Sequence, residues 1–110
     1  MTQKIYDASA ANLDGSDETF STDISNKNKR FTVLYINDTD VEISVSAKLT
    51  RKEDIDLADA VTPNTQTIPS GERGSDVLLD DPWERIGAEV SFSAAPLSGT
   101  VKAYLITNPR

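Results

Sequence analysis

Hydrophobic and polar residues alternate most regularly over residues 41–50. Val41, Ile43, Val45, Ala47 and Leu49 fall on one side of an extended backbone, and the residues between them are polar or charged. Because successive side chains of a strand point to opposite faces, this pattern predicts a strand with one face in the core and the other in solvent. A shift of one residue would expose the whole apolar set, so the pattern also specifies the register.

Other segments predict further strands and the turns between them. Residues 31–36 are apolar on both faces, which indicates a central strand, and the polar residues 37–40 predict a tight hairpin turn after it. Residues 86–94 and 100–107 alternate with a period of two and are separated by the turn-forming residues 95–99. The last two segments therefore predict a second hairpin.

Weaker signals complete the pattern. Residues 19–24 alternate over Phe20, Thr22 and Ile24, and short apolar runs at 67–68 and 77–79 predict brief strands. No apolar repeat of period 3.6 is longer than two turns. About seven short strands separated by turn signals predict an all-β fold, a small antiparallel β-sandwich or jelly roll. Its expected core includes the inward apolar residues Phe31, Val33, Val41, Ile43, Val45, Leu49, Val90, Phe92, Val101 and Leu105.

The N-terminal residues 1–17 are polar and rich in turn signals, which predicts an arm or an edge segment. We expect a polar N-terminal arm over residues 1–17 and a β-sandwich domain over residues 18–110, a length usual for one domain. Ordering the backbone costs ~1–2 kcal/mol per residue, which a segment with few apolar side chains cannot offset alone. An arm of this composition is therefore expected to order only against a partner.

Charge and composition exclude several classes of partner. The chain has 18 acidic and 11 basic residues and a net charge of −7, so it lacks the clustered cations that bind nucleic acid or anionic membranes. An acidic, Asp-rich surface resembles that of proteins from salt-loving microbes. No apolar run approaches the ~20 residues of a membrane span or the core of a signal peptide. The expected place of synthesis is the cytoplasm.

The residue types present also exclude most catalytic chemistry. The sequence has no histidine and no cysteine, so disulfides, thiolate nucleophiles and Ser-His-Asp triads are absent. Gly71-Glu72-Arg73-Gly74 lacks the spacing of a phosphate-binding loop. A non-enzymatic protein without a cofactor is the expectation, with one calcium or magnesium ion as the exception considered.

Asp14, Asp17 and Glu18 are the candidate ligands for such an ion, with a second acidic group at residues 54–59. Neither group has the EF-hand spacing, and aspartate in a turn usually accepts hydrogen bonds from its own backbone. Turn capping is therefore the alternative role of these carboxylates.

The outward side of the last predicted strand carries Lys102, Tyr104 and Ile106. An aromatic and a branched aliphatic residue on a nominally polar face suggest a surface covered by other protein. We interpret the three as interface candidates, the alternative being a second sheet of the same domain folded over them.

A resemblance to a known group of proteins narrows the hypothesis. Residues 79–86, Leu-Asp-Asp-Pro-Trp-Glu-Arg-Ile, lead into a long strand, an Ala95-Pro96-Leu97-Ser98-Gly99 turn and a last strand. This succession resembles small β-sandwich virion structural proteins, of the head-decoration or turret type, of tailed viruses of bacteria and halophilic archaea. The resemblance implies a virion protein present in many copies, which binds itself and other virion proteins such as a major capsid protein.

A carbohydrate-binding or adhesin-like β-sandwich module is the alternative function. In that case Trp83 would stack on a sugar ring beside acidic loops.

Overall fold

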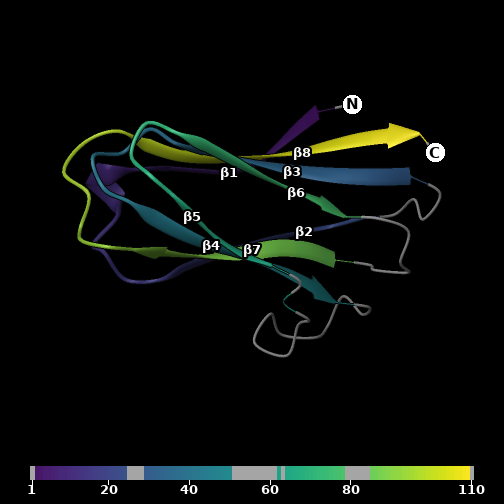
Figure 1. The fold of residues 1–110 in the computed structure, drawn as a ribbon, viewed down its shortest axis with the longest axis horizontal. Coiled ribbons are helices and arrows are strands. Elements are labelled where there is room, and N and C mark those ends of the chain that lie inside the picture. Colours follow the sequence, from purple (N-terminus) through teal and green to yellow (C-terminus); the bar gives the residue numbers. More distant parts are fainter. Residues whose placement is uncertain (1, 25–28, 51–61, 63, 79–84, 110) are drawn as a thin grey trace.

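The structure of this chain is a computed structural model that describes residues 2–24, 29–50, 62, 64–78 and 85–109. Eight antiparallel strands form two four-stranded sheets that face each other as a sandwich (Figure 1). The first sheet has the order β1-β8-β3-β6 and the second β2-β7-β4-β5. The strands are β1 (Thr2–Ser9), β2 (Glu18–Asp23), β3 (Lys29–Asn37), β4 (Ile43–Thr50), β5 (Thr65–Ile68), β6 (Arg73–Leu78), β7 (Arg85–Phe92) and β8 (Thr100–Pro109), with a short 3-10 turn, η1 (Ala10–Asn12), after β1.

The order of the strands identifies a jelly roll. β1 pairs with β8, β2 with β7, β3 with β6 and β4 with β5, so the chain resembles one long hairpin with its tip between β4 and β5. Rolling this hairpin brings β3 beside β8 and β4 beside β7, which completes both sheets. The predicted all-β sandwich or jelly roll is confirmed.

Both predicted hairpin turns are wrong. β3 and β8 lie in the first sheet while β4 and β7 lie in the second, so residues 38–42 and 93–99 carry the chain from one sheet to the other. All consecutive strands except β4 and β5 are divided between the sheets in this way. Turn-forming residues allow the chain to reverse, but they do not decide whether the next strand pairs with the last one or packs across the core from it.

The N-terminal segment, expected to be an arm or an edge segment, begins with an edge strand, β1. Thr2–Ser9 form an edge strand paired with β8 along its length, interrupted by a register shift between Lys4 and Tyr6. The ring of Tyr6 also stacks on Phe20 of β2, with centroids 4.6 Å apart. Strand pairing and this stack offset the entropy of ordering, which the few apolar residues of the segment alone could not do.

The core lies between the sheets and is built from the alternating inward residues of both. Tyr35, Ile43, Ile68 and Ile86 are among the largest side chains that are almost fully buried. Most residues of the predicted core are buried, including Val45 and Val90. The exceptions are two half-buried residues: Phe92 packs against the core, and Val41 precedes β4 in a loop.

A buried polar group crosses this core near the edge formed by β5 and β6. The Tyr35 hydroxyl donates to Asp76 Oδ2 at 2.9 Å, and Asn64 Nδ2 donates to Asp76 Oδ1 at 2.7 Å. Burial, followed by the charge of Asp76, raises the pKa of Tyr35 well above its usual range. Two donors thus satisfy a carboxylate that would be costly to bury alone.

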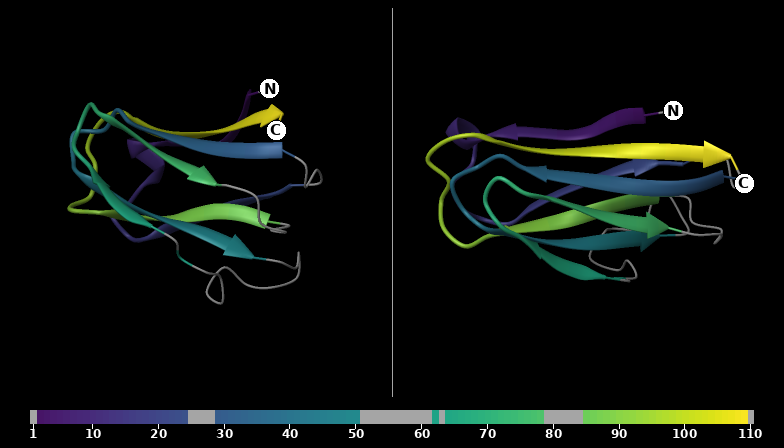
Figure 2. Two further views of the ribbon diagram at one scale, coloured as in Figure 1. Left: turned by 45° about the vertical axis from the view of Figure 1, so that its right-hand side comes forward. Right: turned by 45° about the horizontal axis from the view of Figure 1, so that its top comes forward.

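Within the part of the chain that the structure describes, no helix is both long and apolar enough to cross a membrane. Figure 2 shows that β1 begins and β8 ends at one end of the sandwich. Four connections, at residues 10–17, 38–42, 69–72 and 93–99, lie at the opposite end, which we call the loop end.

Candidate interaction surface

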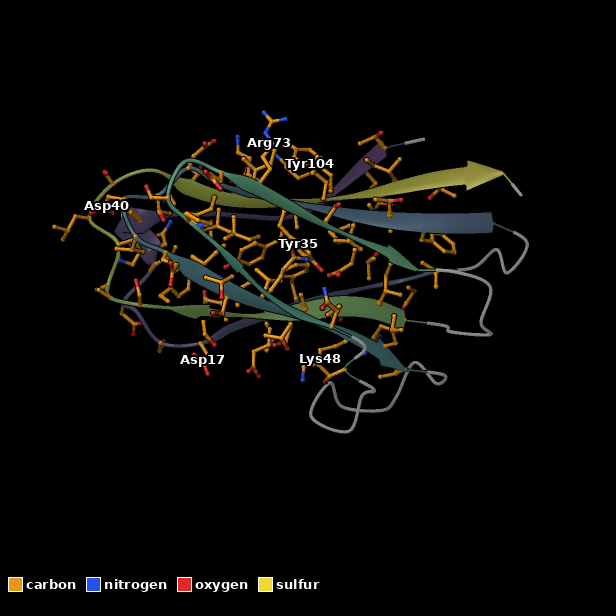
Figure 3. All side chains as sticks on the ribbon, in the orientation of Figure 1. Asp17, Tyr35, Asp40, Lys48, Arg73 and Tyr104 are labelled. Carbon is orange, nitrogen blue, oxygen red and sulfur yellow. The ribbon has the colours of Figure 1, made fainter. Side chains whose placement is uncertain are left out.

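The three interface candidates on β8 point away from the core. Lys102, Tyr104 and Ile106 are half-buried, and the residues that alternate with them are buried against the second sheet. Neither Tyr104 nor Ile106 belongs to the core cluster or packs against it. Figure 3 shows Tyr104 on the outer side of the first sheet, whereas Tyr35 lies between the sheets. The second sheet of the same domain therefore does not cover these side chains.

Strand pairing gathers more apolar residues around Tyr104 and Ile106. Leu34 of β3 lies directly opposite Tyr104, and Ile36 lies opposite Lys102. Directly paired residues share a face of the sheet, and their side chains are in contact range. Leu34, Ile36, Tyr104 and Ile106 consequently form one patch on the outer face of the first sheet, which we call the apolar patch.

Charged residues surround the apolar patch. Lys4 of β1 pairs with Tyr104, and Lys4 Nζ donates to Asp7 Oδ2 at 2.9 Å. This hydrogen bond raises the pKa of Lys4 and lowers the pKa of Asp7, so both stay charged and cancel each other. Asp7 also lies opposite Lys102, whose charge adds to the lowering of its pKa, so three cations, Lys4, Lys102 and Arg73, face one carboxylate on this side of the sheet. Among the outward residues of this sheet whose side chains the structure describes, the balance is therefore positive, in a chain with a net charge of −7.

The outer face of the second sheet differs in character. Its described outward residues include Ser44, Ser46 and Thr67, with Glu89 and an ion pair in which Arg85 Nε lies 3.1 Å from Asp23 Oδ1. No large apolar side chain is among them. The two broad faces of the sandwich are thus unequal, and among the described residues only those of the first sheet combine large apolar side chains with an excess of cations.

The candidate metal ligands lie at and beside the loop end. Asp14 Oδ1 accepts hydrogen bonds from the backbone N–H and the hydroxyl of Ser16, which lower the pKa of Asp14. Asp17 is exposed, and Glu18 begins β2 near the ring of Tyr6. The described residues contain no group of three or more acidic side chains that could hold a metal ion. Asp14 thus takes the turn-capping role. The acidic residues at 54–59 lie outside the described residues.

Hydrogen bonds connect the loops at the loop end to one another. Asn37 is fully buried; its Nδ2 donates to the carbonyl oxygens of Val41, Ile68 and Pro69 at 2.9, 3.0 and 3.2 Å. Its Oδ1 accepts from the backbone N–H and the hydroxyl of Thr39. One side chain thereby ties residues 38–42 to residues 69–72.

A second connection involves Asp40, which Figure 3 shows at this end. Asp40 Oδ1 accepts from the backbone N–H groups of Leu97 and Ser98 at 2.8 and 3.2 Å, and these bonds lower the pKa of Asp40. Leu97 itself is 87% exposed. Neither Leu97 nor Asp40 stands out as functional in the sequence, because the contact joins residues that are far apart along the chain.

Comparisons with known proteins concern the fold. No family model matches the chain, and no curated protein matches it. A structure of Bacillus endospore appendages, a family of disulfide-linked pili, is similar with a TM-score of 0.55 and 9% identity, covering 99% of this chain and 87% of that one. The coat protein of tobacco streak virus is similar with a TM-score of 0.52 and 10% identity, covering 100% and 83%. At identities this low, the similarities show that the fold is shared.

Proposed function

We propose that the protein is a non-enzymatic virion structural protein that assembles in many copies on a tailed-virus particle, in a decoration, turret or related accessory role. The apolar patch is the observation that carries the proposal. It presents four large apolar side chains on a regular sheet face, where the intervening strands hold them in fixed positions. A rigid surface of this kind loses little entropy when a partner covers it.

The dimensions of the molecule support docking through this face. The Cα trace extends over 40 × 26 × 20 Å, and a sheet face lies along the longest axis. A stable protein interface typically buries about 800 Å² on each partner, which a face of this size can provide. Both similar structures described above are, by their names, subunits of larger assemblies, a virus coat and pili.

Light-scattering mass measured from micromolar to millimolar concentration tests the assembly. The wild-type chain should form species heavier than one copy, and Ile106→Glu should reduce this association strongly, because it places a charge within the apolar patch, beside Leu34 and Tyr104. Thr67→Glu adds the same charge on the outer face of the second sheet and should assemble as the wild type does.

Circular dichroism melting should show that all three chains are folded. A wild-type chain that stays monomeric throughout, or an Ile106→Glu variant that assembles normally, would argue against docking through this face. Immunogold labelling of purified virus particles would then locate the protein on the head or the tail, and unlabelled particles would refute the virion assignment.

The carbohydrate-binding alternative relies on Trp83, which lies outside the described residues. No described feature favours that function.

A further inference from the structure

Folding gathers the negative charge of this protein at the loop end. The connections there contain six exposed carboxylates, and residues 10–17, 38–42, 69–72 and 93–99 contain no lysine or arginine. The net charge of the whole chain is −7, so this end carries most of it. The six carboxylates belong to Asp14, Asp17, Asp38, Asp40, Glu42 and Glu72.

An exposed apolar side chain lies on the same end. Leu97 is the single large hydrophobic side chain that is exposed among the described residues. Asp40 fixes the backbone on which Leu97 stands, and the backbone N–H of Asp38 donates to the carbonyl oxygen of Thr100 at 2.9 Å just beyond it. Gly99 allows this close approach, because a Cβ there would meet the carbonyl oxygen of Asp38. Leu97 is thus presented on a preorganised loop.

The loop end and the apolar patch are complementary. One is acidic with the exposed Leu97 beside Asp40, and the other is apolar with Lys102 and Arg73 at its border. We infer that the loop end of one copy docks on the apolar patch of a second copy, with Leu97 packed against Leu34 and Tyr104. This inference rests on the proposed function, which makes the patch the docking face, and it adds the identity of the partner surface.

Charge favours this arrangement over a symmetric one. If two copies met patch to patch, Lys102 and Arg73 of both copies would share one interface with only Asp7 of each copy to offset them, and an excess of like charge in an interface is unfavourable. When the loop end of one copy lies on the apolar patch of another, its carboxylates meet the cations at the border of the patch, and opposite charges attract. Because the two surfaces differ, the contact is head-to-tail and repeats from copy to copy as a ring or an open chain.

The contact area predicts how strong each contact is. The short end of the sandwich measures about 26 by 20 Å, so the area that it can bury is smaller than the ~800 Å² per partner of a standard interface. A single contact of this size is weak, so assembly should depend on concentration. It should also weaken as sodium chloride rises, because salt screens the charges at the border.

Two variants that each lose one surface provide the test. Ile106→Glu disables the patch and leaves the loop end intact, and Leu97→Glu disables the loop end and leaves the patch intact. Leu97→Glu should lower the association constant on the order of tenfold or more, as removal of a central apolar anchor does. Thr67→Glu is again the control of equal charge.

Mixing the two variants distinguishes this inference from the proposed function. Each variant alone should be monomeric by light scattering, and an equimolar mixture should form dimers but nothing larger, since only one productive contact remains. If Leu97→Glu assembles as the wild type does, or if the mixture stays monomeric, the head-to-tail contact is refuted while docking through the patch stands. A monomeric wild-type chain would refute both.

Discussion

Replacing the buried Asn37 by alanine should destabilise the protein more than any exposed polar substitution. The Asn37 side chain donates to three carbonyl oxygens and accepts from two groups of Thr39, all at the point where the chain passes between the sheets. Asn37→Ala removes every one of these bonds and leaves the backbone N–H of Thr39 and the carbonyl oxygen of Ile68 without that partner.

The size of the effect follows from these contacts. A typical hydrogen bond contributes about 0.5–1.5 kcal/mol net, and a buried polar group left unpaired costs about 1–3 kcal/mol. Two buried groups that lose this partner, together with a small void, place the loss of unfolding free energy at about 3–5 kcal/mol. Domains have only about 5–15 kcal/mol in total, so the variant should be marginally folded.

Asn37→Asp is a second test, because the aspartate side chain has nearly the same shape as asparagine. It replaces the Nδ2 donor by a carboxylate oxygen that faces three carbonyl oxygens. This environment should raise the pKa of the introduced carboxyl above its unfolded value. The folded state then binds more protons than the unfolded state, so stability should rise as the pH falls through the raised pKa toward the unfolded one. Asn37→Ala should not share this additional rise.

Urea unfolding followed by far-UV circular dichroism measures both effects. Asn12→Ala serves as control, since Asn12 is exposed and bonds only to the Ser9 hydroxyl among the described residues. Its unfolding free energy should stay within about 0.5 kcal/mol of the wild type. A loss below about 1 kcal/mol for Asn37→Ala, with an unchanged urea dependence, would refute the role of Asn37, and so would an Asn37→Asp variant whose stability followed the pH dependence of the wild type.

The remaining predictions concern the core and the charges. Val45→Asp should prevent folding, because an unpaired charge in so small a core costs several kcal/mol; a soluble variant with a cooperative melt would contradict the register of β4. Tyr35→Phe should lose about 1–3 kcal/mol in urea unfolding, because Asp76 loses a donor, whereas Tyr6→Phe should be neutral or stabilising, since the buried Tyr6 hydroxyl has no partner in the described structure. Burial, and then Glu18, raises the pKa of Tyr6 from 10.0 to about 12, so the stability linked to this group is full below pH 10 and declines as the pH rises toward 12, a decline that Tyr6→Phe should reduce. Moderate potassium chloride should raise the melting temperature by screening the carboxylates of the loop end, and a flat or falling melting temperature would count against mutual repulsion there.

The local pattern of the sequence was sufficient to predict most strands and the direction of their side chains. Alternation from Ile43 to Leu49 matches the buried positions of β4, and the apolar segment from Phe31 to Ile36 matches a central strand, β3, between β8 and β6. Lys102, Tyr104 and Ile106 were also predicted to face outward from sequence alone. Side-chain direction depends on the period of the backbone, which short segments already contain.

The partner of each strand was decided only by the tertiary structure. Residues 37–40 and 95–99 are turn-forming and fit a hairpin as well as a crossing between sheets. The crossing is formed because it lets β3 and β4, and likewise β7 and β8, bury their apolar faces against each other across the core. The buried side chain of Asn37 then satisfies the backbone groups of the crossing, which involves residues about thirty positions away. The same reason applies to β1: its polar sequence leaves an arm and an edge segment equally open, and the exposed edge of β8 provides the pairing that orders it as a strand.

The candidate interaction surface also depends partly on local sequence and partly on tertiary structure. The outward direction of its residues on β8 follows from the sequence. The register of β3 and β8 then places Leu34 and Ile36 on the same face. The six carboxylates of the loop end are dispersed along the chain and come together only when the strands form the two sheets. Sequence determines which side of a strand is apolar because that property is local. The tertiary structure determines which strands and loops share a surface, because that depends on contacts between residues far apart in the chain.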